Sequence, residues 1–174
     1  MPSNLEVKAR IASIRRASHF ALKLGARRQG VLAQKDTYYR SPSGRLKVRE
    51  INGRQCELIY YHRKNFKGNR YSDYRRIPLE RSRDMKRLLA ELLGVLCVVK
   101  KQRRLFLYKN SRIHLDTVRG LGDFLEFEVL VTNGKQQART LMKQLWEAFE
   151  IRKDAVVAGS YSDFLQQAGG RKNF

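Results

Sequence analysis

Apolar and polar residues alternate along much of this chain, and a period of two is typical of β-strands with one buried face. From Asn4 to Arg10, apolar residues on one side alternate with charged or polar residues on the other. The same reasoning predicts further strands over residues 31–40, 45–50, 55–63, 70–78, 95–108 and 112–118, and a last strand after the turn at 120–123. The pattern therefore predicts eight strands, most of them joined by turns of hairpin length, such as Asn52-Gly53.

Other segments carry apolar residues at helical spacing instead. A possible Ser13 cap and a stop at Gly25 delimit a helix over residues 13–24, in which Arg15, Arg16 and Lys23 are expected to face solvent. Further helices are predicted over residues 84–93, 136–149 and 161–167. Helices are thus expected after the first, fifth and eighth strands.

The order of elements favours an α+β fold: an eight-stranded antiparallel β-barrel, or tunnel, with flanking helices. We expect a single domain over residues 1–174, with a core at about 4–165 and a frayed tail at 169–174. In a closed barrel every second side chain points to the interior. Because the apolar alternates must pack against the helices outside, the other set should line the interior.

That second set is charged. It consists of Glu6, Lys8, Lys47, Arg49, Lys101, Arg103, Arg112, Asp116, Glu126 and Glu128. A dry lumen of this kind is costly, because each buried charge needs a partner. A bound polyanion with its metal ions would neutralise it.

The acidic residues of the last strand suggest where metal could bind. Glu126 and Glu128 share one strand face, and the preceding turn could bring Asp116 towards them. Paired carboxylates in a basic chain suit a divalent ion held by oxygen atoms. A solvated polar face explains the same residues equally well from this segment alone.

Composition identifies the kind of partner but not the partner itself. The 174 residues include 37 Lys+Arg and 16 Asp+Glu, which gives a formal net charge of +21. Such a charge implies an anionic partner, which could be nucleic acid, polyphosphate, nucleotide or a membrane surface.

The remaining sequence features concern the cellular setting. Cys56 and Cys97 lie in apolar runs without metal-ligand spacing, so we predict reduced core cysteines and no zinc site. No apolar run approaches the length of a signal peptide or membrane span. These features favour a cytoplasmic protein without a membrane partner, present as a monomer or homodimer.

Several ordered motifs resemble one known family. They are Asn-Leu-Glu-Val-Lys near the start, Gly-Arg-Leu-Lys-Val-Arg-Glu, Val-Val-Lys-Lys-Gln-Arg-Arg, Arg-Ile-His-Leu-Asp, Gly-Leu-Gly-Asp-Phe-Leu-Glu-Phe-Glu and the late Gly-Ser-Tyr. Together they are similar to the CYTH family, the triphosphate tunnel metalloenzymes, and most closely to its class IV adenylyl cyclase branch. The resemblance spans about Asn4 to Leu165. It implies a tunnel that binds a linear triphosphate together with Mg²⁺ or Mn²⁺.

The resemblance also implies roles for individual residues. Glu6, Asp116, Glu126 and Glu128 match metal-binding acids, and Asn4 stands where the family motif Glu-x-Glu-x-Lys has its first Glu. Phosphate-gripping cations match Lys8, Lys47, Arg49, Lys101, Arg103 and Arg112, of which Lys8, Arg49 and Arg112 are the predicted catalytic residues. Tyr61, Arg63 and His114 are further candidates for the tunnel lining, each with a structural explanation at least as good.

Two enzymatic functions and one binding function remain open. The first is cyclisation of ATP to cyclic AMP and pyrophosphate, and the second is hydrolysis of an inorganic or organic triphosphate. The third is a module that binds polyphosphate or RNA without turnover, which the lack of a base-reading helix or an aromatic RNA-binding signature makes less favoured. The expected partner is therefore a nucleoside triphosphate or inorganic triphosphate.

Overall fold

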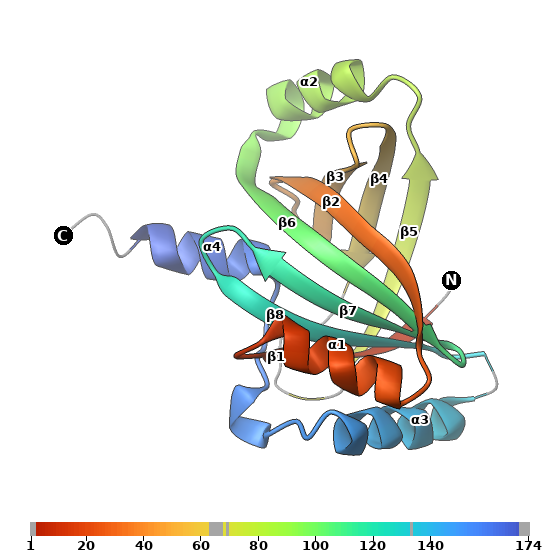
Figure 1. Ribbon diagram of the computed structural model, residues 1–174. Helices are drawn as coiled ribbons and strands as arrows, with labels where there is room; N and C mark the ends of the chain where they lie inside the picture. The colour runs from red at the N-terminus through yellow and green to blue at the C-terminus, as the bar shows by residue number, and fades with distance from the viewer. Residues whose placement is uncertain (1–2, 63–67, 69, 133, 171–174) are drawn as a thin grey trace.

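The computed structural model describes residues 3–62, 68, 70–132 and 134–170. Eight antiparallel strands close into a barrel in the order β1-β5-β4-β3-β2-β6-β7-β8 (Figure 1). The strands are β1 Ser3–Arg10, β2 Arg27–Tyr39, β3 Arg45–Ile51, β4 Gln55–His62, β5 Arg70–Pro78, β6 Val95–Tyr108, β7 Ser111–Val118 and β8 Gly122–Leu130. The predicted fold class and the number of strands are confirmed.

The helices lie around this barrel. They are α1 Ile14–Lys23, α2 Ser82–Leu93, α3 Lys135–Ala148 and α4 Tyr161–Gly170, with a 3₁₀ turn at Lys153–Ala155. In Figure 1, α1 and α3 cover the lower side of the barrel and α2 lies above it. As predicted, Ser13 caps α1 by accepting a hydrogen bond from the Arg16 amide at 3.2 Å. Gly25 follows the helix with φ +86°, a conformation that glycine adopts without strain.

The main apolar core lies outside the barrel wall, between the strands and the helices α1 and α3. Leu5 and Val7 of β1 pack there with Phe127 of β8 and with Met142 and Leu145 of α3. Burying one such side chain contributes roughly 1.5–3 kcal/mol to stability. Because this core holds one set of alternating side chains, it directs the other set into the lumen.

The α2 helix is attached differently. It buries none of its residues, and Leu92 is 70% exposed. The adjoining start of β6 is correspondingly open, with Leu96 and Val98 exposed. The prediction of core cysteines is therefore wrong in part: Cys56 of β4 and Cys97 of β6 are free thiols, but both are only half-buried. For Cys97 the reason is that α2 covers the start of β6 incompletely.

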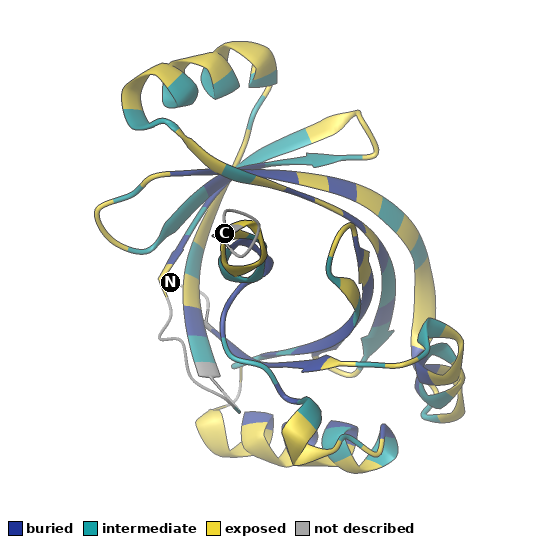
Figure 2. Ribbon diagram, turned by 90° about the vertical axis from the view of Figure 1, so that its left-hand side faces the viewer, coloured by how far each residue is buried: buried dark blue, intermediate teal, exposed yellow. Residues whose placement is uncertain are grey.

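The α4 helix closes one end of the barrel. It extends away from the barrel (Figure 1) and is projected onto the ring of strands when seen along the barrel (Figure 2), and Ser160 and Tyr161 at its start line the internal cavity. We call this the plugged end, and the opposite end the open end. The predicted tail is partly helical, since α4 runs to Gly170; residues 171–174 and Arg63 lie outside the described part of the chain. In that part, no helix combines the length and the apolar character needed to cross a membrane.

Candidate active site

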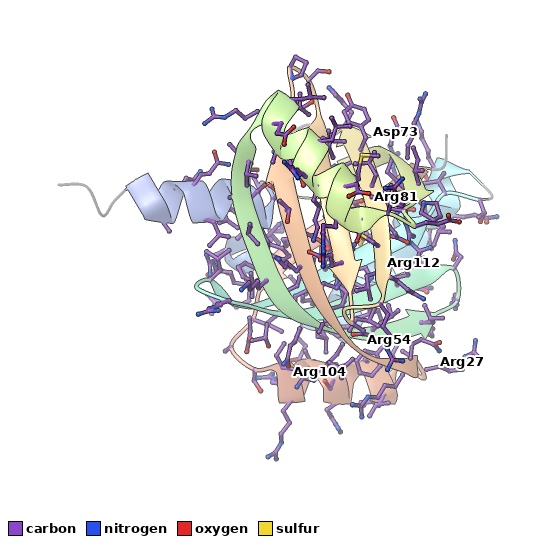
Figure 3. The ribbon with its side chains drawn as sticks, turned by 90° about the horizontal axis from the view of Figure 1, so that it is seen from above. Arg27, Arg54, Asp73, Arg81, Arg104 and Arg112 are labelled. Atoms are coloured by element: carbon purple, nitrogen blue, oxygen red, sulfur yellow. The ribbon has the colours of Figure 1, made fainter. Side chains whose placement is uncertain are left out.

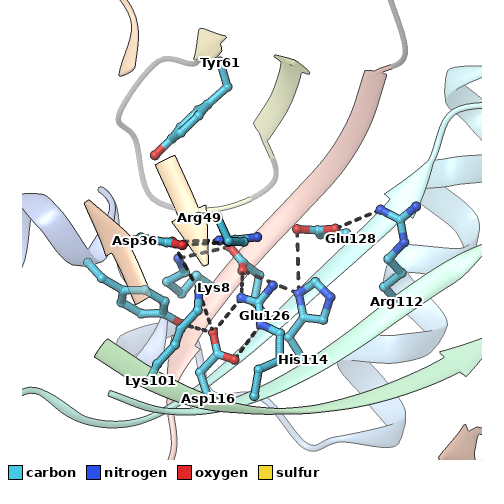
Figure 4. Close-up of polar contacts among 12 residues, drawn as sticks. Lys8, Asp36, Arg49, Tyr61, Lys101, Arg112, His114, Asp116, Glu126 and Glu128 are labelled. Carbon is cyan, nitrogen blue, oxygen red and sulfur yellow. Dashed lines mark hydrogen bonds and ion pairs between the residues drawn. The ribbon is translucent and has the colours of Figure 1, made fainter. Parts of the chain in front are cut away.

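The barrel encloses a cavity of about 280 Å³. Among the residues predicted from the sequence, Asp116 does not line it, whereas the others do: Asn4, Glu6, Lys8, Lys47, Arg49, Lys101, Arg103, Arg112, Glu126 and Glu128. Tyr61 and His114 line it as well. The cavity thus gathers side chains from strands that are far apart in the sequence (Figure 4).

The polar lining follows from strand alternation. On β1, Glu6 and Lys8 point into the lumen, while Leu5 and Val7 enter the outer core. On β8, Glu126 faces the lumen and Phe127 faces the core. Lys8 stands directly opposite Glu126 across the β1–β8 pair, and the two side chains form a buried ion pair at 3.0 Å. A shift of one residue in either strand would send these charges into the apolar core.

A first group of cations converges on Asp36 of β2, whose side chain is fully enclosed. The Arg49 guanidinium donates two hydrogen bonds to its carboxylate, both 2.7 Å long, and the Lys47 ammonium donates another of the same length. Burial alone would raise the pKa of Asp36, but Arg49 and Lys47 hold it well below its usual value. Asp36 is therefore ionised and fixes both cations at the lumen wall.

A second group converges on Asp116 of β7. Arg103 donates hydrogen bonds of 2.7 and 2.6 Å to its two oxygens, and the Tyr161 hydroxyl donates one of 2.9 Å. Despite complete burial, Arg103 and then Lys101 lower the pKa of Asp116. Because its carboxylate lies behind the lumen wall and is occupied by these donors, we leave Asp116 out of the proposed metal ligands.

Lys101 lies between the two aspartates. Its Nζ is 3.6 Å from an oxygen of Asp116 and 4.0 Å from an oxygen of Asp36. Burial and the neighbouring Arg103 lower the pKa of Lys101 to about 8. The Tyr161 ring at the plugged end lies 3.9 Å from Nζ of Lys8 and 5.0 Å from that of Lys101. This part of the lumen therefore presents several ammonium and guanidinium groups to an anion.

The acidic part of the lumen is built more loosely around His114, although Glu126 itself pairs with Lys8 and accepts a hydrogen bond of 3.1 Å from Arg103. Nδ1 of His114 lies 3.7 Å from an oxygen of Glu126 and 3.7 Å from an oxygen of Glu128, too far for a hydrogen bond. Among the described residues, this nitrogen has no hydrogen-bond partner although it is buried. Burial and then Arg103 lower the pKa of His114, which favours the neutral imidazole that can bind a metal ion.

His114, Glu126 and Glu128 fit a divalent cation. One ligand atom of each lies within 4.8 Å of the others, and two carboxylates with one imidazole suit Mn²⁺ or Mg²⁺. An ion placed among them would occupy the gap that leaves Nδ1 of His114 unpartnered. Glu6 pairs directly with Glu128 across β1 and β8 and faces the same cavity. Asn4, two residues before Glu6, is buried, and its Oδ1 has no hydrogen-bond partner among residues 3–62, 68, 70–132 and 134–170.

Sequence analysis missed two important lumen residues. Asp36 was overlooked because it is a single acid in its strand, and its partners lie on β3 and β6. Its position in alternation with Gln34 and Tyr38 was the available signal. Tyr161 follows the Gly-Ser pair that was noticed, but its contact with Asp116 depends on how α4 docks at the barrel end.

Comparison with known proteins places this geometry in context. The sequence pattern of the family described as CYTH domain matches residues 3–156. The PH1012 protein of Pyrococcus horikoshii OT3 is 25% identical, with a TM-score of 0.84 over 92% of this chain and 98% of that one. No curated protein matches the chain by sequence.

Two further solved structures share the fold at lower identity. A proposed adenylate cyclase from Vibrio parahaemolyticus is 18% identical, with a TM-score of 0.75 over 94% of this chain and 97% of that one. A proposed adenylyl cyclase from Hippeastrum, described as having a dominant triphosphatase activity, is 14% identical, with a TM-score of 0.65 over 96% of each chain.

Proposed function

The chain belongs to the CYTH domain family, and on this premise we propose that it is a metal-dependent enzyme acting on a triphosphate, with cyclisation of ATP to cyclic AMP and pyrophosphate as the first candidate reaction. Members of this family are typically enzymes, adenylyl cyclases or triphosphatases. The observation that carries the proposal is the presence, in one lumen, of a cation cluster beside His114, Glu126 and Glu128, of which the first two are buried and the third is half-buried.

The cations have a clear role in this proposal. Lys8, Lys47, Arg49, Lys101 and Arg103 bind phosphate oxygens at the plugged end, and Arg112 extends the grip towards the open end. Guanidinium and ammonium donors fixed beforehand stabilise charge that develops on a leaving phosphate without having to reorganise. Asp36 and Asp116 hold the donors in place before substrate arrives.

The acids and His114 supply the metal site in this proposal. Glu126, Glu128 and the neutral His114 would hold Mn²⁺ or Mg²⁺, with Glu6 beside them. When bound, the ion adds positive charge at the phosphate oxygens. The protein residues orient the triphosphate so that the reacting phosphorus faces its nucleophile.

The two candidate reactions differ in that nucleophile. In cyclisation, the ribose 3′-oxygen forms a bond to the α-phosphorus, its proton is lost, and the bond to the β-phosphate oxygen breaks to release pyrophosphate. In hydrolysis, a water oxygen forms a bond to the terminal phosphorus and loses a proton, the bond from that phosphorus to the bridging oxygen breaks, and the diphosphate part leaves, so that the terminal phosphoryl group becomes orthophosphate. The triphosphatase activity described for the Hippeastrum protein supports hydrolysis as the second candidate.

Binding of RNA or polyphosphate to the outer surface is less well supported. Of the exterior cations labelled in Figure 3, Arg27 and Arg104 lie on the neighbouring strands β2 and β6, whereas Arg81 directly precedes α2. Binding to such a surface through phosphates should weaken steeply with salt. A single triphosphate enclosed in the lumen should instead saturate at one per chain.

Product identification tests the proposal. Purified protein is incubated with ATP or inorganic tripolyphosphate and with Mg²⁺ or Mn²⁺, and the products are separated. Cyclic AMP with pyrophosphate would establish the cyclase, and orthophosphate release would establish the hydrolase. No product with any metal would contradict an enzymatic function and favour the binding module.

A further inference from the structure

The wall of the lumen changes character towards the open end. Leu32 and Gln34 of β2, Ile51 of β3 and Leu105 of β6 all line the cavity. We call these four residues the neutral wall. Gln34 pairs directly with Ile51, and Leu32 pairs with Arg103, the residue two positions before Leu105. Because β2 lies between β3 and β6 in the barrel, the four side chains form one continuous surface.

The neutral wall directly continues the cation cluster. Along β3 the inward side chains are Lys47, Arg49 and then Ile51; along β6 they are Lys101, Arg103 and then Leu105. Both strands therefore pass from cations near Tyr161 to an apolar side chain at the open end. A linear ligand with its phosphates on the cations would extend its other end along this wall.

The charges at the open end are already paired among the described residues. Arg112 forms an ion pair of 3.4 Å with Glu128, and Arg76 forms one with Glu57, all four side chains lining the cavity. The residues facing β2 across the barrel are on β1 and β5, where Asn4 and Ser72 are directly paired and uncharged. Beyond Arg112, the side of the lumen opposite β2 is therefore neutral at Asn4 and Ser72.

One buried polar atom on the neutral wall also lacks a partner. Gln34 is only 5% exposed, and Oε1 of its amide has no hydrogen-bond partner in the part of the chain that the structure describes. A buried acceptor without a donor is costly. A ligand group with an N–H or O–H donor, placed against the leucine and isoleucine side chains, would satisfy it.

From this arrangement we propose that the neutral wall is the subsite for the nucleoside of a nucleoside triphosphate, with Leu32, Ile51 and Leu105 contacting its apolar faces and Gln34 accepting a hydrogen bond from it. The proposal rests on the proposed function, because it needs the triphosphate in the lumen. It makes the natural substrate an organic triphosphate rather than inorganic tripolyphosphate. The cavity of about 280 Å³ is small for a triphosphate and a nucleoside together, so the nucleoside lies partly outside it, at the open end of the barrel.

Two adjacent residues of β2 give a matched test. Leu32 faces the lumen, whereas Val31 is exposed on the outside. Leu32→Thr and Val31→Thr introduce the same side chain one residue apart. Ile51→Thr repeats the test from β3 if Leu32→Thr lowers the melting temperature. Binding of ATP, methyl triphosphate and inorganic tripolyphosphate is measured by calorimetry with Mg²⁺, and the products are checked after each titration.

We expect wild type to bind ATP more tightly than methyl triphosphate. Leu32→Thr should weaken ATP binding by about tenfold while changing tripolyphosphate binding by less than about twofold. Val31→Thr should change neither. Equal binding of ATP and methyl triphosphate by wild type, or parallel changes for ATP and tripolyphosphate in Leu32→Thr, overturns the subsite but leaves the proposed function standing. Failure of wild type to bind any of the three overturns both.

Discussion

The proposed phosphate and metal site has two ends of its own, distinct from the ends of the barrel. The cation clusters around Asp36 and Asp116 form what we call the complete end, and His114, Glu126 and Glu128 form the incomplete end. The two are built in opposite ways. Around Asp36 and Asp116, each guanidinium already makes two hydrogen bonds of 2.6–2.7 Å to a carboxylate. Around His114, the distances to Glu126 and Glu128 are 3.7 Å, and Nδ1 has no partner. The first end is complete without a ligand, and the second leaves a gap the size of an ion. The comparison suggests that the same types of charged residue serve folding at one end and binding at the other.

Replacing Asp116 at the complete end should have the largest effect on stability. Asp116→Asn removes the bidentate partner of buried Arg103 and leaves it Glu126, 3.1 Å away, so we expect the free energy of unfolding to fall by about 3 kcal/mol at pH 7. Glu128→Gln at the incomplete end should cost less than about 1 kcal/mol, because Arg112, the partner of Glu128, is only half-buried. Chemical denaturation of both variants checks this. Equal losses would remove the distinction between the two ends.

The loss of stability in Asp116→Asn should depend on pH. The pKa of Asp116 is lower in the folded state than in the unfolded chain, so its stabilisation is present above about pH 4 and disappears as pH falls through the folded-state value. The stability difference between wild type and Asp116→Asn should therefore be constant above about pH 5 and shrink in more acidic solution. A difference that stays constant to pH 2 would contradict an ionised Asp116.

At the incomplete end, the expected loss concerns metal binding. Glu126→Gln should weaken Mn²⁺ binding by about 10–100-fold, because a carboxylate ligand becomes a neutral amide. Calorimetric titration of Mn²⁺ into each protein measures it. Asp36→Asn is the control at the complete end and should leave Mn²⁺ affinity within about threefold.

Replacing a single phosphate-binding cation should have a smaller effect. Arg49→Ala removes one charge-assisted contact, which should weaken triphosphate binding or turnover by about 1–3 kcal/mol. The protein should remain folded, although Asp36 keeps only Lys47 as a close partner. Unchanged binding and kinetics would exclude Arg49 from the phosphate site.

The smallest expected effect is the uptake of a proton when a triphosphate binds. Burial and Arg103 lower the pKa of Lys101 to about 8, so at pH 9 much of the empty protein carries a neutral lysine. A bound triphosphate favours the ammonium form, and binding should then take up close to one proton. Calorimetry in two buffers of different ionisation enthalpy measures this uptake, and Lys101→Met should abolish it. The buried charge of Lys101 also destabilises the folded protein. This cost is present below pH 8 and is lost as pH rises from 8 towards 10.

Strand alternation was sufficient to predict the strands of the barrel, because most of them carry an apolar face and a polar face, although Leu32, Ile51 and Leu105 point inwards. It was less successful where alternation is interrupted. The β2 strand begins at Arg27 rather than at residue 31, and its pairing with β6 shifts between Arg28 and Gly30, a polar segment without a regular pattern. Local sequence has no signal for a strand held mainly by its neighbour.

The site could be predicted in part. Acids and cations on inward positions of the strands were readily placed in the lumen, but which charge faces which depends on the register between strands. Asp36 meets Arg49 because these residues are directly paired across β2 and β3. The division between a complete and an incomplete end was therefore not readable from the sequence, since it is set by distances across the barrel.

The pairing of β1 with β8 also determines when such a site can arise during folding. These strands are the first and last of the eight, and they bring Glu6 beside Glu128 and Lys8 beside Glu126. Closing so long a loop carries a large entropic cost before any contact rewards it, which slows folding of proteins rich in such pairings. A chain emerging from the ribosome has no closed lumen until residues up to Leu130 are available. The hydrogen bonds that close the barrel and the ability to bind a ligand should therefore appear at the same stage of folding.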